Sequence, residues 1–363
     1  MPSTLLSLAS KQVWPHVLVV SHLRPERLIL LHSSEAEESE KPARRLRDFF
    51  IKSGLLSGSS IQTVRIPHDD MRQVESICRE IRGKAKDASW LTHFTGGNKL
   101  MATGAFLDAI RNKVPACYLE RGNRLFWFKV ENRDLTTSSE KIDGHIADKL
   151  DALDLLLCQM SHTELSGRGE KLQLREDVST ESFHKQLLTN AHSFFTSRRR
   201  PASEPQRGDS LEYAVAAIAL WRGVKSVYRS VGIREAGTTK EQTDFDVVFN
   251  YGGKLWLVDC KDRTTHRAKF TKVRHFIDKK RDGADAIFRS LQQLENEAEA
   301  THYIWLKQAI LDVQRAGGLL GKVVFVRKSV LPAEVMQFAA DLGVPVLTKE
   351  TLYSGLQELL DAS

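Results

Sequence analysis

The sequence predicts an α/β fold with two domains. Its 363 residues are enough for two separate hydrophobic cores. In the first half, short apolar segments alternate with segments of helical spacing, which is typical of a mostly parallel sheet. In the second half, two apolar segments flank Gly252-Gly253, which predicts a buried β-hairpin. We therefore expect one domain over residues 1–160, a connecting segment over 161–210 and a second domain over 211–363.

Composition excludes several classes of protein. Hydrophobic residues make up 41% of the chain and charged residues 27%, which is ordinary for a globular protein. No apolar segment approaches the length of a membrane span, and the first residues lack the features of a signal peptide. The four cysteines are scattered without a C-x-x-C pair, which argues against a zinc ribbon or a disulfide framework. A cytoplasmic protein without a membrane partner is expected.

The elements of the first half follow from spacing and turn residues. Strands are expected at 17–20, 27–31 and 61–66, with helices over 37–55 and 70–81. Asp69 or Asp70 is expected to cap the second helix. A further strand over 89–94 leads into a helix that ends near 112. The segments 114–120 and 125–130 predict a hairpin that closes a Rossmann-like sheet.

A glycine turn lies between a strand and a helix in this first half, at Thr95-Gly96-Gly97-Asn98-Lys99. Such a turn exposes backbone N–H groups at a helix N-terminus, where phosphates bind well. It also lies at the carboxyl end of a strand, where open α/β sheets bind ligands. The turn is neither a Walker A motif nor G-x-G-x-x-G. The alternative is a tight turn with a surface lysine.

The elements of the second half are less regular. Helices are expected over 145–160, 181–195, 211–221 and 284–316, with strands at 322–326 and 344–347. A glycine-containing linker over 161–170 and a proline- and charge-rich loop after 195 separate the first of these. Asp209 or Ser210 is expected to cap the helix that carries Glu212.

The hairpin gathers charged residues at its open end. If Gly252-Gly253 is the turn, partners on the two strands have numbers that sum to 505, which places Asp246 opposite Asp259 and Asp244 opposite Lys261. These four share one face, while the rest of the hairpin is apolar on both faces and predicts burial on both sides. Two close carboxylates repel each other unless a cation lies between them, and a hard divalent ion suits oxygen ligands. The alternative is a surface Asp–Lys ion pair.

A basic segment follows directly. Residues 261–281 contain nine Lys or Arg and only two acidic residues, in a chain whose net charge is +7. Beside an acidic metal site, such a segment would hold a polyanion such as nucleic acid. A solvated helix face is the other interpretation.

These motifs resemble those of known families. Asp246 followed by Asp259-Cys260-Lys261 resembles the signature of the PD-(D/E)xK nucleases, and TGGNKLM is similar to the ligand loop of CARF domains, which sense cyclic oligoadenylate. Their order resembles the CRISPR ancillary nucleases, in which a CARF domain precedes a PD-(D/E)xK domain of restriction-endonuclease-like fold. The chain departs from the nuclease pattern by having Asp244 and Asp259 where Glu is common.

The resemblance implies a function and its residues. It implies a homodimeric endonuclease of type III CRISPR defence, activated by cyclic tetra-adenylate and dependent on Mg²⁺ or Mn²⁺. Thr95, Gly96, Gly97, Asn98 and Lys99 would line the activator site, with Ser21 as a further candidate at the end of the expected first strand. Asp246, Asp259 and the Cys260 carbonyl would ligate the metal, with Lys261 orienting the attacking water and Asp244 nearby.

Other roles and functions stay open at this point. Glu212 would help to hold the metal or its waters, or would simply interact with the positive end of the helix dipole. The chain could be an unregulated restriction or repair nuclease with a dimerising first domain. It could instead be a non-catalytic sensor that binds nucleic acid. The sequence does not distinguish DNA from RNA as substrate.

Overall fold

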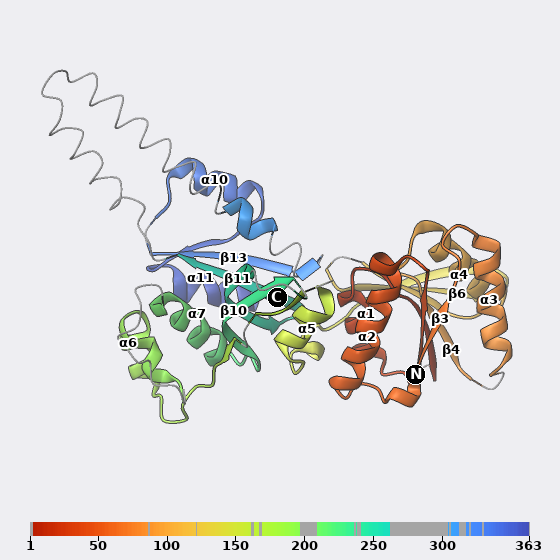
Figure 1. Ribbon diagram of the computed structural model, residues 1–363, viewed down its shortest axis with the longest axis horizontal. Coiled ribbons are helices and arrows are strands. Elements are labelled where there is room, and N and C mark those ends of the chain that lie inside the picture. Colours follow the sequence, from red (N-terminus) through yellow and green to blue (C-terminus); the bar gives the residue numbers. More distant parts are fainter. Residues whose placement is uncertain are drawn as a thin grey trace, which may run out of the picture.

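The computed structural model describes residues 3–85, 88–120, 122–160, 163–166, 169–196, 209–235, 237, 241–261, 304, 306–311, 317–318, 321–328 and 330–362. The basic segment after Lys261, the proline-rich loop and most of the helix expected over 284–316 lie outside these residues. Within them, the chain forms two mixed sheets with helices on both faces of each (Figure 1). None of the described helices is both long and apolar enough to cross a membrane.

The first sheet has the order β3-β2-β1-β4-β5-β6-β7. Its strands are β1 Thr4–Leu8, β2 Arg27–His32, β3 Ile61–Arg65, β4 Trp90–His93, β5 Ala116–Leu119, β6 Arg124–Glu131 and β7 Asp134–Lys141. The first five are parallel, and β6 and β7 are antiparallel additions at one edge. Chain order reverses between β1 and β4, so the loops after these two strands diverge there and leave a crevice for a ligand.

Helices cover both faces of this sheet, and strand alternation explains the division. α1 Trp14–Leu23 and α2 Lys41–Lys52 pack on the face that carries Leu5 and Leu28. α3 Met71–Gly83 and α4 Lys99–Arg111 pack on the opposite face, with Leu6 and Leu8. Two of these helices have side-chain caps: Asp70 accepts from Gln73 N at 2.9 Å, and Asn98 accepts from Met101 N at 2.9 Å.

The prediction of a strand at 17–20 is wrong, because these residues lie in α1. This helix is buried on nearly all sides, so its sequence shows neither a polar face nor helical periodicity, and a short valine-rich segment then looks like a strand. The true first strand is β1. The exposed edge strand β7 was not expected either, since all eight of its residues are exposed and carry no apolar alternation.

The second sheet has the order β14-β13-β12-β11-β10-β8, with β9 also paired to β10. Its strands are β8 Thr163–Leu165, β9 Glu170–Lys171, β10 Val227–Glu235, β11 Glu241–Tyr251, β12 Lys254–Lys261, β13 Gly321–Arg327 and β14 Val346–Thr348. The helices beside it are α5 Ala152–Gln159, α6 Thr180–Asn190, α7 Asp209–Trp221, α10 Ala333–Asp341 and α11 Leu352–Asp361. Strands β8 and β9 come from the segment expected to be a linker, and β10 was not predicted.

Several helix boundaries also differ from the sequence expectation. The helix expected over 145–160 is divided into a short 3₁₀ turn, η3 Gly144–Ala147, and α5. Other short turns flank the regular helices: η1 Ala36–Glu40, η2 Gly58–Ser60 and η4 Ala191–Phe194.

The β11–β12 hairpin has the predicted register and burial. Every pair in its ladder sums to 505, from Val247 opposite Val258 to Tyr251 opposite Lys254. One face packs with α7 and α11, and the other joins the core that contains α1, α2 and α5. The core that contains α1, α2 and α5 includes residues of both sheets, so continuous apolar packing joins the two halves of the protein.

Candidate functional sites: a cavity in the first sheet and an acidic hairpin end

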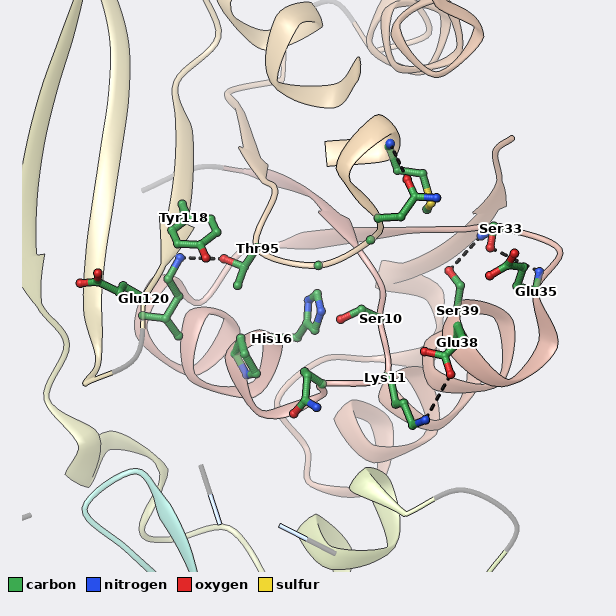
Figure 2. Close-up of a pocket in the computed structure, with 17 residues that line it drawn as sticks. Ser10, Lys11, His16, Ser33, Glu35, Glu38, Ser39, Thr95, Tyr118 and Glu120 are labelled. Atoms are coloured by element: carbon green, nitrogen blue, oxygen red, sulfur yellow. Dashed lines mark hydrogen bonds and ion pairs between the residues drawn. The ribbon is translucent and has the colours of Figure 1, made fainter. Parts of the chain in front are cut away.

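A cavity of about 590 Å³ opens at the carboxyl ends of the parallel strands of the first sheet (Figure 2). Its lining comes from the loops after β1, β2, β4 and β5 and from the adjoining parts of β5, α1, η1 and α4: Ser10, Lys11, Gln12, Pro15, His16, Ser33, Glu35, Glu38, Ser39, Thr95, Gly96, Gly97, Asn98, Met101, Tyr118, Leu119 and Glu120. The strand order reverses at this position, so the cavity lies where the topology alone predicts a ligand.

The glycine loop forms one wall of this cavity. Gly97 has a φ of +74°, and a Cβ on Gly96 would lie 1.9 Å from the carbonyl oxygen of Leu8. Neither position therefore accepts a side chain without moving backbone. Asn98 closes the loop by capping α4 and by donating from Nδ2 to the His68 carbonyl at 2.7 Å. The loop is thus held at a helix N-terminus, as a phosphate site requires.

The structure separates the predicted activator residues into two groups. Thr95, Gly96, Gly97 and Asn98 line the cavity. Lys99 is exposed at the start of α4 and Ser21 is buried in α1, and neither lines it. The prediction for Ser21 depended on a first strand at 17–20; because the first strand is β1, the residues that follow it are Ser10 and Lys11, which do line the cavity.

The loop between β1 and α1 was missed by sequence reasoning, although it carried a signal. The segment Thr4–Leu8 contains three leucines in five residues, and all five residues are buried. Pro15 lies in the first turn of α1, where proline is favoured. Together these features place a strand, then a loop, then a helix, with Ser10, Lys11 and Gln12 at the carboxyl end of the strand.

The cavity has mixed charge. Glu35, Glu38 and Glu120 line it, against one lysine, Lys11, whose Nζ lies 3.1 Å from Glu38 Oε1. A purely anionic ligand would be repelled by three carboxylates, so its phosphates are best placed against the backbone N–H groups of the glycine loop. The carboxylates can accept hydrogen bonds from hydroxyl or amino groups. A nucleotide presents both kinds of group.

The second site lies at the open end of the hairpin. The Asp246 Oδ2 atom accepts from Cys260 N at 2.5 Å and from Lys261 Nζ at 3.3 Å. Lys261 Nζ also lies 2.6 Å from Asp259 Oδ1. The three side chains predicted from the 505 register therefore lie together, with the lysine ammonium between two carboxylates.

Burial controls the protonation of this trio. It raises the pKa of Asp246 and of Asp259, and the attraction of Lys261 offsets only part of that effect. Burial alone would lower the pKa of Lys261, but the two carboxylates outweigh it and raise that pKa above its ordinary value. Burial also raises the pKa of the Cys260 thiol well above normal, so the thiol is neutral. Any metal contact from Cys260 is therefore left to its carbonyl.

The other predicted site residues lie nearby with partners of their own. Glu212 Oε2 is 3.3 Å from Arg229 Nη1, so an arginine offsets its charge. Asp244 is exposed on β11 and pairs with Gly232 of β10. Its negative charge contributes to the raised pKa of Asp246. Metal roles for Glu212 and Asp244 stay predictions.

In the described part of this site, Asp246 and Asp259 are the carboxylates that could hold a metal ion. Within the described ranges, no three or more His, Cys, Asp and Glu side chains are grouped so as to hold a metal ion. Asp246 and Asp259 do share one cation, the Lys261 ammonium. This arrangement fits a cationic group between the two carboxylates, because their mutual repulsion needs one.

Arg327 is an addition that the sequence did not point to. It ends β13, is paired in register with Lys261 on β12, and is 2% exposed. Burial lowers the pKa of its guanidinium to about 10, although Asp259 opposes that shift. Arg327 therefore brings a second cation to the acidic end of the hairpin.

Comparison with known proteins gives structural relatives. No protein-family model and no curated protein matches the sequence. Can2 from Sulfobacillus thermosulfidooxidans, solved with cyclic tetra-adenylate, is 18% identical, with 98% of this chain and 99% of Can2 covered and a TM-score of 0.63. Protein VC1899 from Vibrio cholerae is 14% identical, with coverage of 99% and 97% and a TM-score of 0.64.

A third solved structure is a type III CRISPR defence DNA nuclease activated by cyclic oligoadenylate. It is 18% identical over 90% of this chain, with a TM-score of 0.55, and this chain spans 45% of its length. At these identities the likeness establishes the fold. The chain therefore shares the two-part α/β fold of Can2 and VC1899, and the fold class expected from the sequence is confirmed.

Proposed function

We propose that this protein is a metal-dependent endonuclease of type III CRISPR defence, switched on by cyclic tetra-adenylate. The observation that carries the proposal is the presence of both sites in one chain of this fold. A nucleotide-sized cavity lies at the switch point of the first sheet, and an Asp–Asp–Lys trio lies at the end of a buried hairpin in the second. The proteins that share the fold include one solved with cyclic tetra-adenylate and one DNA nuclease.

The activator site is proposed to be shared by two copies of the chain. A cyclic tetranucleotide has repeated phosphates, which suit two identical glycine loops related by a two-fold axis. In that arrangement the exposed Lys99 at the start of α4 is free to reach a ligand across the interface. Thr95 and the loop N–H groups bind within each protomer.

The nuclease site is proposed to act through Asp246, Asp259 and the Cys260 carbonyl, which would hold Mg²⁺ or Mn²⁺. The ion, when bound, polarises the scissile phosphate and lowers the pKa of its water. Lys261 keeps its proton because of its two carboxylate partners, so its role is to orient the water and stabilise developing negative charge, not to act as a base. Arg327 adds positive charge for the substrate phosphate.

Cleavage of DNA and RNA with and without cyclic tetra-adenylate, in Mg²⁺, in Mn²⁺ and after chelation, tests this function. We expect cutting only when both activator and metal are present. Equal cutting without activator would indicate an unregulated nuclease. Activator binding without cutting in any metal would indicate a sensor that lacks catalysis.

A further inference from the structure

Four polar side chains form one hydrogen-bonded chain beneath the glycine loop. His16 Nδ1 lies 2.9 Å from Ser7 Oγ, which lies 2.8 Å from His93 Nδ1. His93 Nε2 lies 2.8 Å from Thr95 Oγ1, which also accepts from Leu119 N at 2.7 Å. Ser7, His16 and His93 are almost fully buried, and the two ends of the series, His16 and Thr95, both border the cavity.

Both histidines in this chain are neutral near pH 7. Burial lowers the pKa of His16 to about 4, and burial together with the neighbouring His16 lowers the pKa of His93 well below its ordinary value. A neutral imidazole has one N–H and one lone pair. When the Ser7 hydroxyl donates to one ring and accepts from the other, each hydrogen bond fixes the direction of the next, and the four side chains have two possible orientations.

The environment of the His16 Nε2 atom, at one end of the hydrogen-bonded series, selects between the two orientations. His16 Nε2 is buried, and no atom of the described part of the protein forms a hydrogen bond with it. A buried N–H without an acceptor is rarer and more costly than a buried acceptor without a donor. The His16 proton is therefore on Nδ1 and is donated to Ser7. Ser7 then donates to His93 Nδ1, and the His93 proton on Nε2 is donated to Thr95.

In this orientation the Thr95 hydroxyl can form one more hydrogen bond, and only as a donor. Its oxygen already accepts from His93 and from the Leu119 N–H, so both of its lone pairs are occupied. Only its own O–H remains, and the cavity is where a new acceptor can lie. We propose that His16, Ser7 and His93 act as positioning residues that make Thr95 an obligate hydrogen-bond donor to a phosphate oxygen of the activator. This inference deepens the proposed function and rests on it for the identity of the ligand.

The orientation can be read directly in the unliganded protein. ¹⁵N NMR of histidine-labelled protein at pH 7 distinguishes a protonated Nδ1 from a protonated Nε2. We expect His16 protonated only at Nδ1 and His93 only at Nε2. A His93 proton on Nδ1, or a charged ring, would overturn the inference, whether or not the protein binds cyclic tetra-adenylate.

Ligand binding gives a second test that a merely structural role would not pass. His93→Asn removes the N–H aimed at Thr95 and should weaken binding of cyclic tetra-adenylate by about threefold to tenfold. His93→Gln can restore an N–H at that position and should bind like the wild type. In a Thr95→Val background, His93→Asn should cause no further loss. If His93→Asn weakened binding in the Thr95→Val background as much as in the wild type, His93 would not act through Thr95.

A buried hydroxyl that does not belong to this hydrogen-bonded series provides the control. Thr4 is on the same strand as Ser7, is fully buried, and its hydroxyl has no hydrogen-bond partner in the described structure. Thr4→Val should therefore leave binding unchanged. If wild-type protein fails to bind cyclic tetra-adenylate while the tautomers are as expected, the proposed activator is wrong, but the inferred direction of the hydrogen bonds from His16 to Thr95 still holds.

Discussion

At the scale of single residues, the lysine at the open end of the hairpin has the most specific proposed role. Lys261 contacts both Asp246 and Asp259, and these contacts keep it protonated. A protonated lysine beside a scissile phosphate stabilises charge that develops in the transition state. Its removal should affect the chemical step more than the fold, because the side chain is 35% exposed.

Lys261→Ala should lower cleavage by at least about a hundredfold, because loss of one charged transition-state contact has effects of that order. Single-turnover cleavage at saturating metal measures it. Lys254→Ala, at the opposite end of the same strand, is the matched control and should cut normally. Near-normal cutting by Lys261→Ala would remove this residue from the mechanism.

The buried histidines make stability dependent on pH. The pKa of His16 is lowered to about 4, so between that value and 6.5 the unfolded chain binds a proton that the folded chain does not. Stability is therefore fully present above pH 6.5 and is lost as the pH falls towards 4. His16 alone should reduce the free energy of unfolding by about 2 kcal/mol between pH 7 and pH 5. Denaturant titrations at the two pH values measure it, and His16→Asn should reduce the difference.

At the scale of elements, the glycine loop depends on a close approach between β1 and the start of α4. A methyl group on Gly96 would meet the Leu8 carbonyl at 1.9 Å, and that backbone is held within β1. The loop, not the strand, is therefore the part that must move. Movement there displaces the N–H groups that a phosphate requires.

Gly96→Ala should weaken activator binding by at least about tenfold and lower stability by about 1–3 kcal/mol, as overpacking does. Calorimetric titration with cyclic tetra-adenylate and thermal unfolding measure the two effects. Gly83→Ala is the control, since a Cβ there meets nothing within 4 Å. Unchanged binding by Gly96→Ala would mean that the loop does not hold the ligand.

At the scale of the whole molecule, the hairpin links the two sites. Its turn packs against the first domain: Trp14 Nε1 donates to the Gly253 carbonyl, and Gly252 N donates to Asp148 Oδ1 at 2.8 Å. Its open end carries Asp246 and Lys261. Trp14 begins α1, whose next residues, Pro15 and His16, line the cavity. A movement of α1 on ligand binding would thus reach the hairpin directly.

Trp14→Phe removes the N–H bonded to Gly253 but leaves a buried aromatic ring. We expect activator affinity within about twofold of wild type and a maximal activated cleavage rate about twofold to tenfold lower, as loss of one hydrogen bond suggests. Activator titration of the cleavage rate separates the two quantities. Trp90→Phe is the control, because its Nε1 donates to Ala85 O, at 3.2 Å, within the first domain. Equal effects of both substitutions would exclude this link.

The sequence alone determined the local features of both sites. Two glycines between apolar strands set the hairpin register, and that register brought Asp246, Asp259 and Lys261 together. The glycine turn before α4 likewise marked one wall of the cavity. These predictions succeeded because turn type and strand alternation depend on neighbouring residues only.

Tertiary structure decided what depends on distant contacts. The segment at 17–20 lies in α1, which is buried on nearly all sides, and such burial removes the periodicity that distinguishes a helix from a strand. The packing of α1 on the first sheet places the β1–α1 loop beside the cavity. The same packing brings His16 into contact with Ser7. The docking of Gly253 on Trp14 joins residues 239 positions apart. No spacing rule relates such residues, because their proximity comes from the folded cores and not from the local chain.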